Sequence, residues 1–193
     1  MAEAPFVPDP SGFGERLARR NGLIEAGFAA WEFLPGMRFA ERAAWWRAGA
    51  ERPGAHEGLD ICWYLTSDGA LRSLGAGARV PVLWAGEIVS SVEDFLGVSL
   101  FVAHERRDDR GRQLHSIYGH IRPRPGLVPG SRVGGADEVG AIADPCRNGR
   151  AVPPHLHLTL ALIDRAGAAD RLDWDALRES NRVVLLDPMP TLK

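Results

Sequence analysis

Cysteine is scarce in this chain of 193 residues, which contains only Cys62 and Cys146. Two cysteines are too few for a disulfide-rich scaffold, and these two lie too far apart in the sequence to form part of a four-cysteine zinc site. We therefore expect two buried free thiols. This scarcity excludes the small secreted domains that are held together by several disulfides.

The chain also lacks a long apolar run. No segment approaches the roughly 20 consecutive apolar residues that a membrane-spanning helix needs. The opening stretch MAEAPFVPDPSGFGERLARRNG contains prolines and charges where a secretory signal needs an uninterrupted apolar segment. We expect no membrane span and, by default, a cytoplasmic location, with a periplasmic or cell-wall location only if the chain is exported by another route.

An excess of positive charge is missing as well. The formal net charge is −2, and residues of both signs are interspersed along the sequence. Nucleic-acid-binding proteins need basic patches to contact the phosphate backbone, so we expect no nucleic-acid partner. The hydrophobic fraction of 45% is enough for a core, which at this length indicates one globular domain with a modest extension.

Short apolar, β-branched runs dominate the sequence from about Val80. They are RVPVLWAG, EIVSSV, GVSLFVAHE, LHSIYGHI, HLHLTLALID and VVLLDP, separated by glycine, proline or charged residues. Their pattern predicts a mainly β fold (β-rich α+β) with an antiparallel sheet. The charged segment ERRDDRGRQ between two of the runs is typical of a solvated hairpin loop.

Helix-forming segments precede the first predicted strand. We expect helices within residues 14–31 and 38–49, packed on one side of the sheet, and a short helix within residues 173–181. Four tryptophans near the predicted strands, Trp45, Trp46, Trp63 and Trp84, are expected to fill the core. Tyr118 is also expected to serve mainly in packing.

The segment PPHLHLTLAL places two histidines at the start of an apolar run. Successive side chains of a β-strand point to opposite faces, so His155 and His157 are expected on the same face. HEGLD adds His56 and Asp60, joined by a glycine-containing turn that leads into the strand ICWYL. Histidine nitrogen and aspartate oxygen both suit Zn²⁺.

His56, Asp60 and one histidine of the pair would give three protein ligands and leave a fourth position open for water. An open position is characteristic of catalytic rather than structural zinc sites. A thiolate of Cys62 is a weaker candidate ligand, because the three others suffice. The residues alone do not decide whether His155 or His157 binds the metal.

HSIYGH supplies two further histidines, His115 and His120. A zinc-activated water needs groups that move its proton and stabilise the oxyanion, and an uncoordinated histidine suits these tasks. We expect His120 and one histidine of the PHLH pair to have such roles. His115 is expected to be exposed.

HEGLD, YGHI and PHLHL, in this order, resemble the motifs of the lysostaphin-type (LytM-like) zinc metallopeptidases. The resemblance covers about Pro35 to Pro190. It divides the chain into an N-terminal, partly helical extension over residues 1–34 and a metallopeptidase domain over residues 35–193. The resemblance also implies a zinc groove on one face of the antiparallel sheet.

The resemblance further implies one Zn²⁺ per chain bound by His56, Asp60 and His157, with His120 and His155 as uncoordinated catalytic histidines. The implied activity is that of a zinc metalloendopeptidase that cleaves peptidoglycan stem peptides or cross-bridges. The alternative is a non-hydrolytic module of the same family that binds peptidoglycan or a partner and regulates another enzyme. The segment ERRDDRGRQ is longer and more charged than the tight turn typical of the family.

Overall fold

The computed structural model describes all residues except 1–5, 7–9, 136, 146–151, 165–171 and 179–181. Its described part is mainly β, with a nine-stranded and a three-stranded sheet and the helix α1 (Phe13–Arg20). All strand pairs in the two sheets are antiparallel. The predicted fold class, mainly β with an antiparallel sheet, is therefore confirmed.

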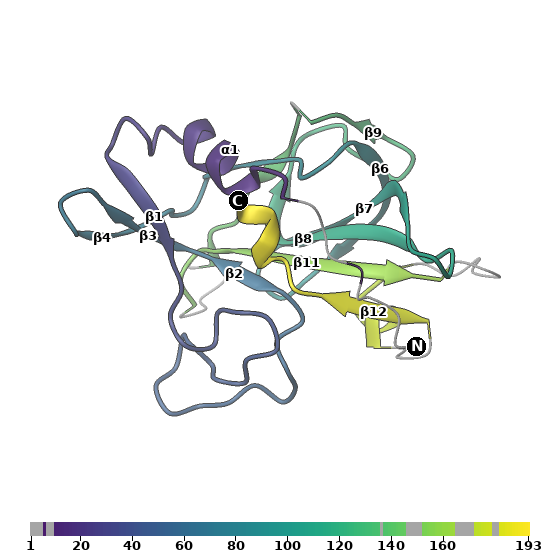
Figure 1. Cartoon of the computed structure of the whole chain (residues 1–193), viewed down its shortest axis with the longest axis horizontal. Coiled ribbons are helices and arrows are strands. Elements are labelled where there is room, and N and C mark those ends of the chain that lie inside the picture. The colour runs from purple at the N-terminus through teal and green to yellow at the C-terminus, as the bar shows by residue number, and fades with distance from the viewer. Residues whose placement is uncertain (1–5, 7–9, 136, 146–151, 165–171, 179–181) are drawn as a thin grey trace.

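The large sheet follows the order β12-β11-β8-β7-β6-β9 (Figure 1). These strands span, in chain order, β6 Gly86–Glu93, β7 Val98–Arg107, β8 Gln113–Pro123, β9 Arg132–Val133, β11 Leu156–Ile163 and β12 Val183–Leu186. Three shorter strands complete it: β2 (Leu59–Ile61) pairs with β11, β10 (Glu138–Ile142) pairs with β8, and β5 (Arg79–Pro81) pairs with β10.

Strands β8 and β11 lie at the centre of the sheet. Every residue of β11 is buried, with leucines on one face and His157 and Thr159 followed by Ala161 and Ile163 on the other. The main core packs against these strands, with Leu100 of β7, Tyr118 of β8 and Leu158 of β11 all fully buried. Polar side chains in this region therefore lie on rigid, well-packed backbone.

A hairpin loop connects β7 to β8 as predicted, but it is shorter than the segment ERRDDRGRQ, because Glu105–Arg107 belong to β7 and Gln113 belongs to β8. Residues 108–112 connect β7 to β8, and the carboxylate of Asp108 accepts hydrogen bonds from the backbone N–H groups of Arg110 and Arg112. The guanidinium of Arg112 also lies 2.6 Å from Asp108. The charges of this segment thus stabilise a local turn at the end of the sheet.

A small sheet of order β1-β3-β4 projects beside the large one (Figure 1). Its strands are β1 (Phe28–Glu32), β3 (Trp63–Thr66) and β4 (Leu71–Ser73). Phe28, Trp31 and Tyr64 form an aromatic cluster between β1 and β3, with ring centroids 5.0 to 6.3 Å apart. Residues 28–31 are therefore a strand, and the helix predicted to reach residue 31 is wrong there.

The first helix ends early because the chain turns at two glycines. Gly22 and Gly27 have φ values of 67° and 83°, in the left-handed region that favours glycine. Upstream of them, α1 buries Phe13 and Leu17 in the main core. The C-terminal 3₁₀ helix η3 (Met189–Leu192) lies beside α1, and the N–H of Gly12 donates to the carbonyl of Lys193.

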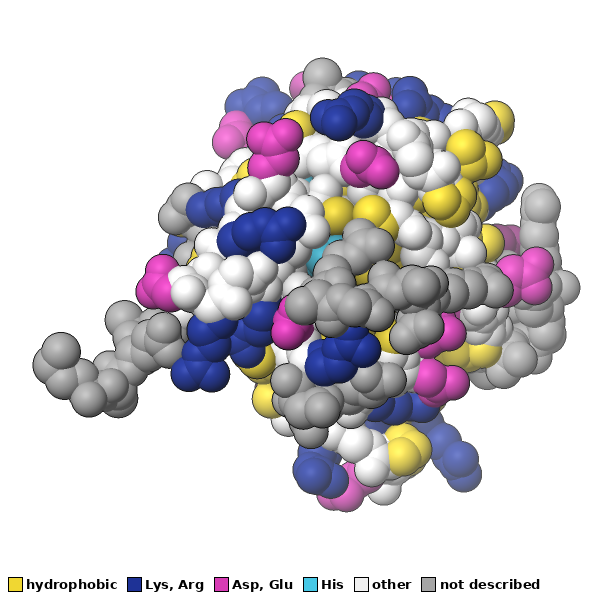
Figure 2. Space-filling view, turned by 90° about the vertical axis from the view of Figure 1, so that its right-hand side faces the viewer, with side chains coloured by type: hydrophobic (Ala, Val, Ile, Leu, Met, Phe, Trp, Pro, Cys, Tyr) yellow, Lys and Arg dark blue, Asp and Glu magenta, His cyan; other side chains and the backbone are white. Residues whose placement is uncertain are grey.

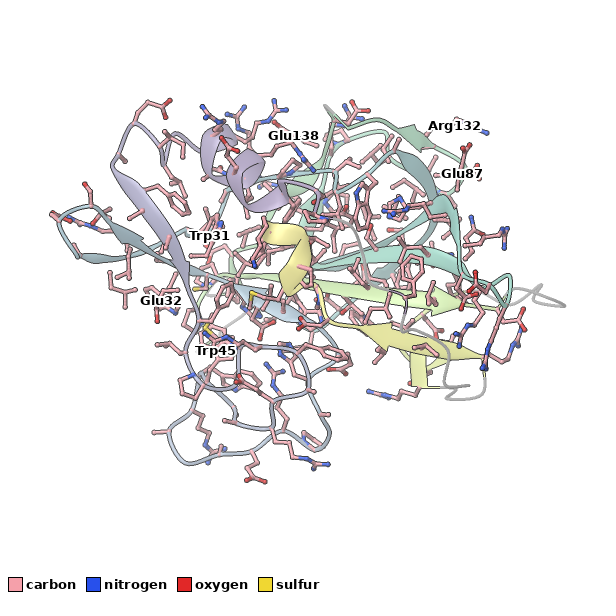
Figure 3. The ribbon with its side chains drawn as sticks, in the orientation of Figure 1. Trp31, Glu32, Trp45, Glu87, Arg132 and Glu138 are labelled. Atoms are coloured by element: carbon pink, nitrogen blue, oxygen red, sulfur yellow. The ribbon has the colours of Figure 1, made fainter. Side chains whose placement is uncertain are left out.

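The helix predicted over residues 38–49 is also wrong. This segment consists of turns, and its isolated β-bridge joins Ala43 to Glu51. Local helix propensity is overridden here by long-range contacts of Trp45, which is labelled in Figure 3 and whose indole N–H donates to Oδ2 of Asp60. Near the C-terminus, the predicted helix within 173–181 is reduced to the 3₁₀ turn η2 (Ala176–Arg178), and residues 179–181 lie outside the described part.

The described helices include none that is both long and apolar enough to cross a membrane. On the face shown in Figure 2, acidic and basic side chains are interspersed rather than separated by sign. This arrangement agrees with the charge pattern of the sequence.

Gly58 allows a close approach of two chain segments. A Cβ atom at this position would lie 2.4 Å from the carbonyl oxygen of Leu158 and 2.7 Å from Oγ1 of Thr159. Gly54 offers a matched control, because a Cβ there would meet nothing within 4 Å. Both glycines precede β2 on the same loop.

We expect Gly58→Ala to lower the free energy of unfolding by about 1–3 kcal/mol, as is typical of overpacking against backbone. Gly54→Ala should change it by no more than about 0.5 kcal/mol. Urea unfolding of the two variants beside the wild type measures the difference. Equal stabilities of the two variants would contradict the packing described here.

Candidate metal centre

Three side chains from two sequence-distant motifs converge at one end of the large sheet. The pairing of β2 with β11 places Asp60 directly opposite His157, and His56 lies four residues before Asp60. Nε2 of His56 is 3.2 Å from Nδ1 of His157 and 3.2 Å from Oδ1 of Asp60. Nδ1 of His157 is 2.8 Å from the same Oδ1. These three residues could hold a metal ion.

The spacing of the three atoms matches that of a tetrahedral zinc site. Zinc bound to nitrogen and oxygen at about 2.0–2.1 Å separates its ligand atoms by about 3.3 Å. The observed separations of 2.8 to 3.2 Å fall slightly below that value. A small outward movement of the side chains would therefore accommodate the ion.

The second nitrogen of each clustered histidine also has a partner. Nδ1 of His56 donates to the carbonyl oxygen of Arg38 at 3.0 Å, which leaves Nε2 without hydrogen for a metal. Nε2 of His157 lies 2.9 Å from Oγ1 of Thr159, a hydroxyl that can accept or donate and so suits either tautomer. Such outer partners orient histidine ligands in metal sites.

Asp60 has its two carboxylate oxygens in different environments. Oδ2 accepts hydrogen bonds from Nε1 of Trp45 and from the guanidinium of Arg52, both at 2.7 Å, while Oδ1 faces the histidines. Burial alone would raise the pKa of Asp60, but the neighbouring histidines hold it well below its ordinary value. Asp60 is thus ionised, with one oxygen directed at the cluster.

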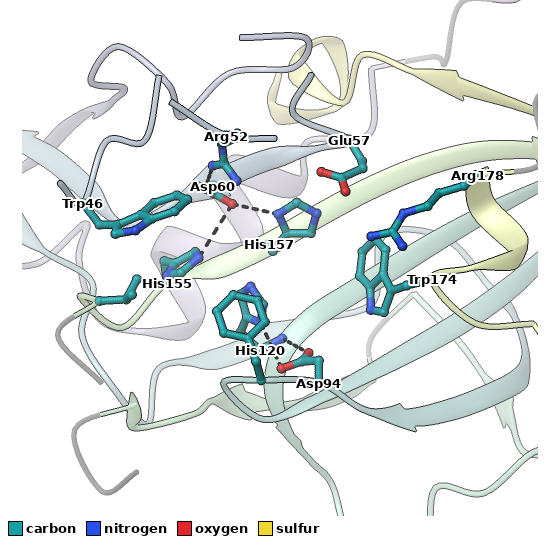
Figure 4. Close-up of a pocket in the computed structure, with 12 residues that line it drawn as sticks. Trp46, Arg52, Glu57, Asp60, Asp94, His120, His155, His157, Trp174 and Arg178 are labelled. Atoms are coloured by element: carbon teal, nitrogen blue, oxygen red, sulfur yellow. Dashed lines mark hydrogen bonds and ion pairs between the residues drawn. The ribbon is translucent and has the colours of Figure 1, made fainter. Parts of the chain in front are cut away.

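His155 lies immediately before β11 and beside the cluster. Its Nδ1 donates to the carbonyl oxygen of Pro153 at 2.8 Å, and its Nε2 is 3.7 Å from Oδ1 of Asp60 (Figure 4). The edge of its ring meets Trp45, with centroids 5.2 Å apart. Burial lowers the pKa of His155 to about 4, against a partial opposing effect of Asp60. His155 is therefore neutral at pH 7, with a lone pair on Nε2.

His120 approaches from the neighbouring strand β8. Its ring centroid is 4.8 Å from that of His155 and 5.7 Å from that of His157. Nδ1 of His120 lies 3.0 Å from Oδ1 of Asp94. The backbone of His120 has a φ of 61°, an uncommon left-handed conformation for a residue other than glycine.

A cavity of about 340 Å³ lies over these groups (Figure 4). Aromatic and charged side chains surround the histidines in it. The lining residues are Trp46, Arg52, Glu57, Asp60, Asp94, Phe95, His120, Val152, His155, His157, Trp174 and Arg178. Asp60 and His157 of the metal cluster and the two additional histidines thus line one concave space, with His56 buried behind them.

The structure brings together all five residues singled out from the sequence, namely His56, Asp60, His120, His155 and His157. These residues belong to three separate motifs of the sequence, HEGLD, YGHI and PHLHL. The pairing of β11 with both β2 and β8 brings the three motifs together.

Other expectations about individual residues were less successful. His115 was expected to be exposed but is completely buried, because its strand lies between β7 and β11. Trp45, Trp63 and Trp84 pack against the core as expected, although Trp45 also donates to Asp60, whereas Trp46 lines the cavity. Tyr118 is a core residue whose hydroxyl accepts the N–H of Leu83.

Cys62 is a buried free thiol, as expected. Burial raises its pKa to about 12, and its Sγ donates to the carbonyl oxygen of Pro154. A protonated thiol is a poor metal ligand. Cys146, the other cysteine of the chain, lies outside the described residues.

Sequence reasoning missed four partners of the site: Trp45, Arg52, Asp94 and Thr159. Thr159 could have been found, because it follows His157 by two residues on the same face of β11. Asp94 carried no such signal, since 26 residues separate it from His120. The contacts of Trp45 and Arg52 with Asp60 depend on the path of an irregular loop.

Comparison with known proteins gives limited similarity. No family model matches the chain, and no curated protein does. Solved structures that it resembles include a mutant of the catalytic domain of the prophage-encoded M23 protein EnpA from Enterococcus faecalis. The match covers 74% of this chain and 90% of that one, at 19% sequence identity and a TM-score of 0.39.

The burial of neutral His155 predicts a pH-dependent stability. The pKa of His155 is about 4 in the folded chain and about 6.5 in the unfolded chain. The unfolded state binds more protons between these values, so stability is lost as the pH falls through this window. Replacing His155 by an uncharged residue should remove the part of this stability loss that comes from protonation of His155.

When the pH is lowered from about 7 to about 5, the free energy of unfolding should fall in both metal-free proteins. The fall should be about 2 kcal/mol larger in the wild type than in His155→Gln. Urea unfolding in the presence of a chelator at both pH values measures this difference. An identical loss in both proteins would show that His155 is not held neutral by the fold.

Proposed function

We propose that this chain is a zinc-dependent endopeptidase whose metal ligands are His56, Asp60 and His157. The observation that carries the proposal is the convergence of three ligand atoms at the wall of a cavity that two further histidines also line. Two imidazoles and one carboxylate are a donor set that suits zinc. Three protein ligands leave one coordination position for a substrate or water, as catalytic zinc sites require.

Zinc, when bound, supplies a Lewis acid that polarises a peptide carbonyl and lowers the pKa of water. The residues of this chain then have separate tasks. Arg52 and Trp45 hold Oδ2 of Asp60, so that Oδ1 stays directed at the ligand cluster. Arg38 and Thr159 orient the rings of His56 and His157.

His155 is the group that accepts the proton of the attacking water. Its Nδ1 carries a hydrogen that is donated to a backbone carbonyl, so Nε2 offers its lone pair. Nε2 also lies 3.7 Å from Oδ1 of Asp60, which places it next to the ligand cluster. A proton acceptor in hydrogen-bonding reach of the nucleophile contributes about 10²–10⁴-fold to such reactions.

His120 is the group that stabilises the developing charge on the carbonyl oxygen. When its ring carries both hydrogens, Nε2–H can donate to that oxygen, and the carboxylate of Asp94 beside Nδ1 offsets the positive charge of the ring. His155 has only a neutral carbonyl beside its Nδ1. This difference favours His120 for the charged role and His155 for the neutral one.

The substrate class proposed is peptide bonds of peptidoglycan, in stem peptides or cross-bridges. The support is the order and chemistry of HEGLD, YGHI and PHLHL, which resemble the motifs of lysostaphin-type metallopeptidases. The cavity adds aromatic surfaces for an extended peptide: Trp46 and Trp174 line it, as does Phe95 with 56% of its surface exposed.

The experiment is digestion of purified peptidoglycan sacculi, with products identified by mass spectrometry. The wild type with one equivalent of zinc should release new peptide termini, and chelator should stop the release. His120→Ala and His155→Ala should keep zinc but lose about 10²-fold or more of the turnover. His157→Ala should lose zinc and activity together.

Two results would contradict this scheme. Zinc retained by His157→Ala but lost by His155→Ala would reverse the assignment of the paired histidines. Binding of sacculi without any cleavage, with zinc present and bound, would replace the hydrolase by the non-hydrolytic module.

A further inference from the structure

Asp94 sits in the turn between β6 and β7 and is unusually rich in hydrogen bonds. Its Oδ1 accepts from the N–H groups of Leu96 and Gly97, at 2.8 and 2.7 Å, and lies 3.0 Å from Nδ1 of His120. Its Oδ2 accepts from the Ser99 hydroxyl at 2.6 Å and from the N–H of His120 at 2.9 Å. Only 4% of the side chain is exposed.

The two bonds from His120 fix both its backbone and its ring. The left-handed φ of 61° is unfavourable for a residue with a Cβ, so it persists only where neighbouring groups hold it. Asp94 holds the N–H of His120, and the N–H of Ala143 holds its carbonyl oxygen at 2.9 Å. This conformation at the end of the histidine motif sets the direction in which the ring leaves the strand.

The same carboxylate decides which nitrogen of His120 carries the hydrogen in the neutral ring. An ionised carboxylate can only accept, so Nδ1 must be the N–H. Burial would raise the pKa of Asp94, but hydrogen bonds and the charge of His120 keep it well below its ordinary value. Within the described part of the chain, the hydrogen bonds of this ring involve Nδ1, and Nε2 is left for the cavity.

Asp94 is also linked through Ser99 to Trp174, another residue that lines the cavity. The hydroxyl of Ser99 donates to Asp94 and accepts the indole N–H of Trp174 at 3.1 Å. The ring of Trp174 in turn lies 5.4 Å from that of His157, centroid to centroid. One buried carboxylate therefore connects a proposed catalytic histidine with an aromatic wall beside a proposed metal ligand.

We propose that Asp94 is a positioning residue for His120: its carboxylate fixes the ring in the Nδ1–H tautomer with Nε2 directed into the cavity. The proposal rests on the proposed function for its catalytic consequence. Its structural part, the orientation and tautomer of His120, stands without any hydrolysis. In the Nδ1–H tautomer, Nε2 is the atom that takes up the second hydrogen, and Asp94 offsets the charge of the ring that then donates to the carbonyl oxygen.

A purely structural role would be to cap the turn that leads into β7. Asp108 provides a matched control for that role, because it accepts two backbone N–H groups in the β7–β8 hairpin and is similarly buried, with 9% of its side chain exposed. No histidine is among its hydrogen-bond partners in the described chain. Asp108→Asn therefore measures what loss of a turn carboxylate does on its own.

The first measurement is ¹H–¹⁵N correlation spectroscopy of the histidine rings in the full chain, with and without one equivalent of zinc. Spectra recorded over a pH series distinguish the two tautomers of the neutral ring. Wild-type His120 should be the Nδ1–H form. In Asp94→Asn the Nε2–H form should rise, while Asp108→Asn should leave the spectrum of His120 unchanged.

The second measurement is turnover of sacculi with zinc content determined on the same samples. Asp94→Asn should keep its zinc and lower kcat about 10²-fold, with a much smaller effect on KM. In a His120→Ala background the same substitution should change turnover by less than about twofold, because the two residues act as a unit. Asp108→Asn should remain near the wild-type rate.

Three outcomes would overturn the proposal. One is an Nε2–H tautomer of His120 in the wild type, which needs no variant to be observed. Another is an unchanged tautomer in folded Asp94→Asn. The third is an equally large loss of turnover from Asp94→Asn with and without His120. Absence of hydrolysis by the wild type would instead count against the proposed function, and the spectra would still decide the positioning of His120.

Discussion

The site depends on the pairing of β2 with β11. That three-residue contact places Asp60 opposite His157 across the ladder and, through the preceding turn, brings His56 to the same point. Side chains alternate along a strand, so a register shifted by one residue would turn these groups to opposite faces. The tight approach at Gly58, and the burial of every residue of β11, leave this register little freedom.

A buried carboxylate among histidines needs compensating partners, since an unpaired charge in the interior is strongly unfavourable. Arg52 and Trp45 satisfy one oxygen of Asp60 and leave the other toward the cluster. Asp94 repeats this arrangement on the neighbouring strands with a different purpose, because its five hydrogen bonds anchor a histidine ring and a turn. Each carboxylate thus sets the direction of the imidazoles around it.

The sequence predicted the strands and the residues of the site better than it predicted the irregular segments around the site. Alternating apolar runs and the motif around His155 depend on local periodicity, which survives in the fold because β8 and β11 are central strands. The irregular segment of residues 38–49 was predicted as a helix, because its local propensity gives no sign of Trp45 reaching Asp60. The partnership of Asp94 with His120 likewise arises only when β6, β7 and β8 assemble.

Crystallography of the zinc-loaded protein, with anomalous diffraction at the zinc edge, locates the metal and its ligands directly. We predict one anomalous peak per chain, about 2.0–2.1 Å from Nε2 of His56, Oδ1 of Asp60 and Nδ1 of His157. A peak bonded to Sγ of Cys62 at about 2.3 Å, or to Nε2 of His155 in place of His157, would contradict it.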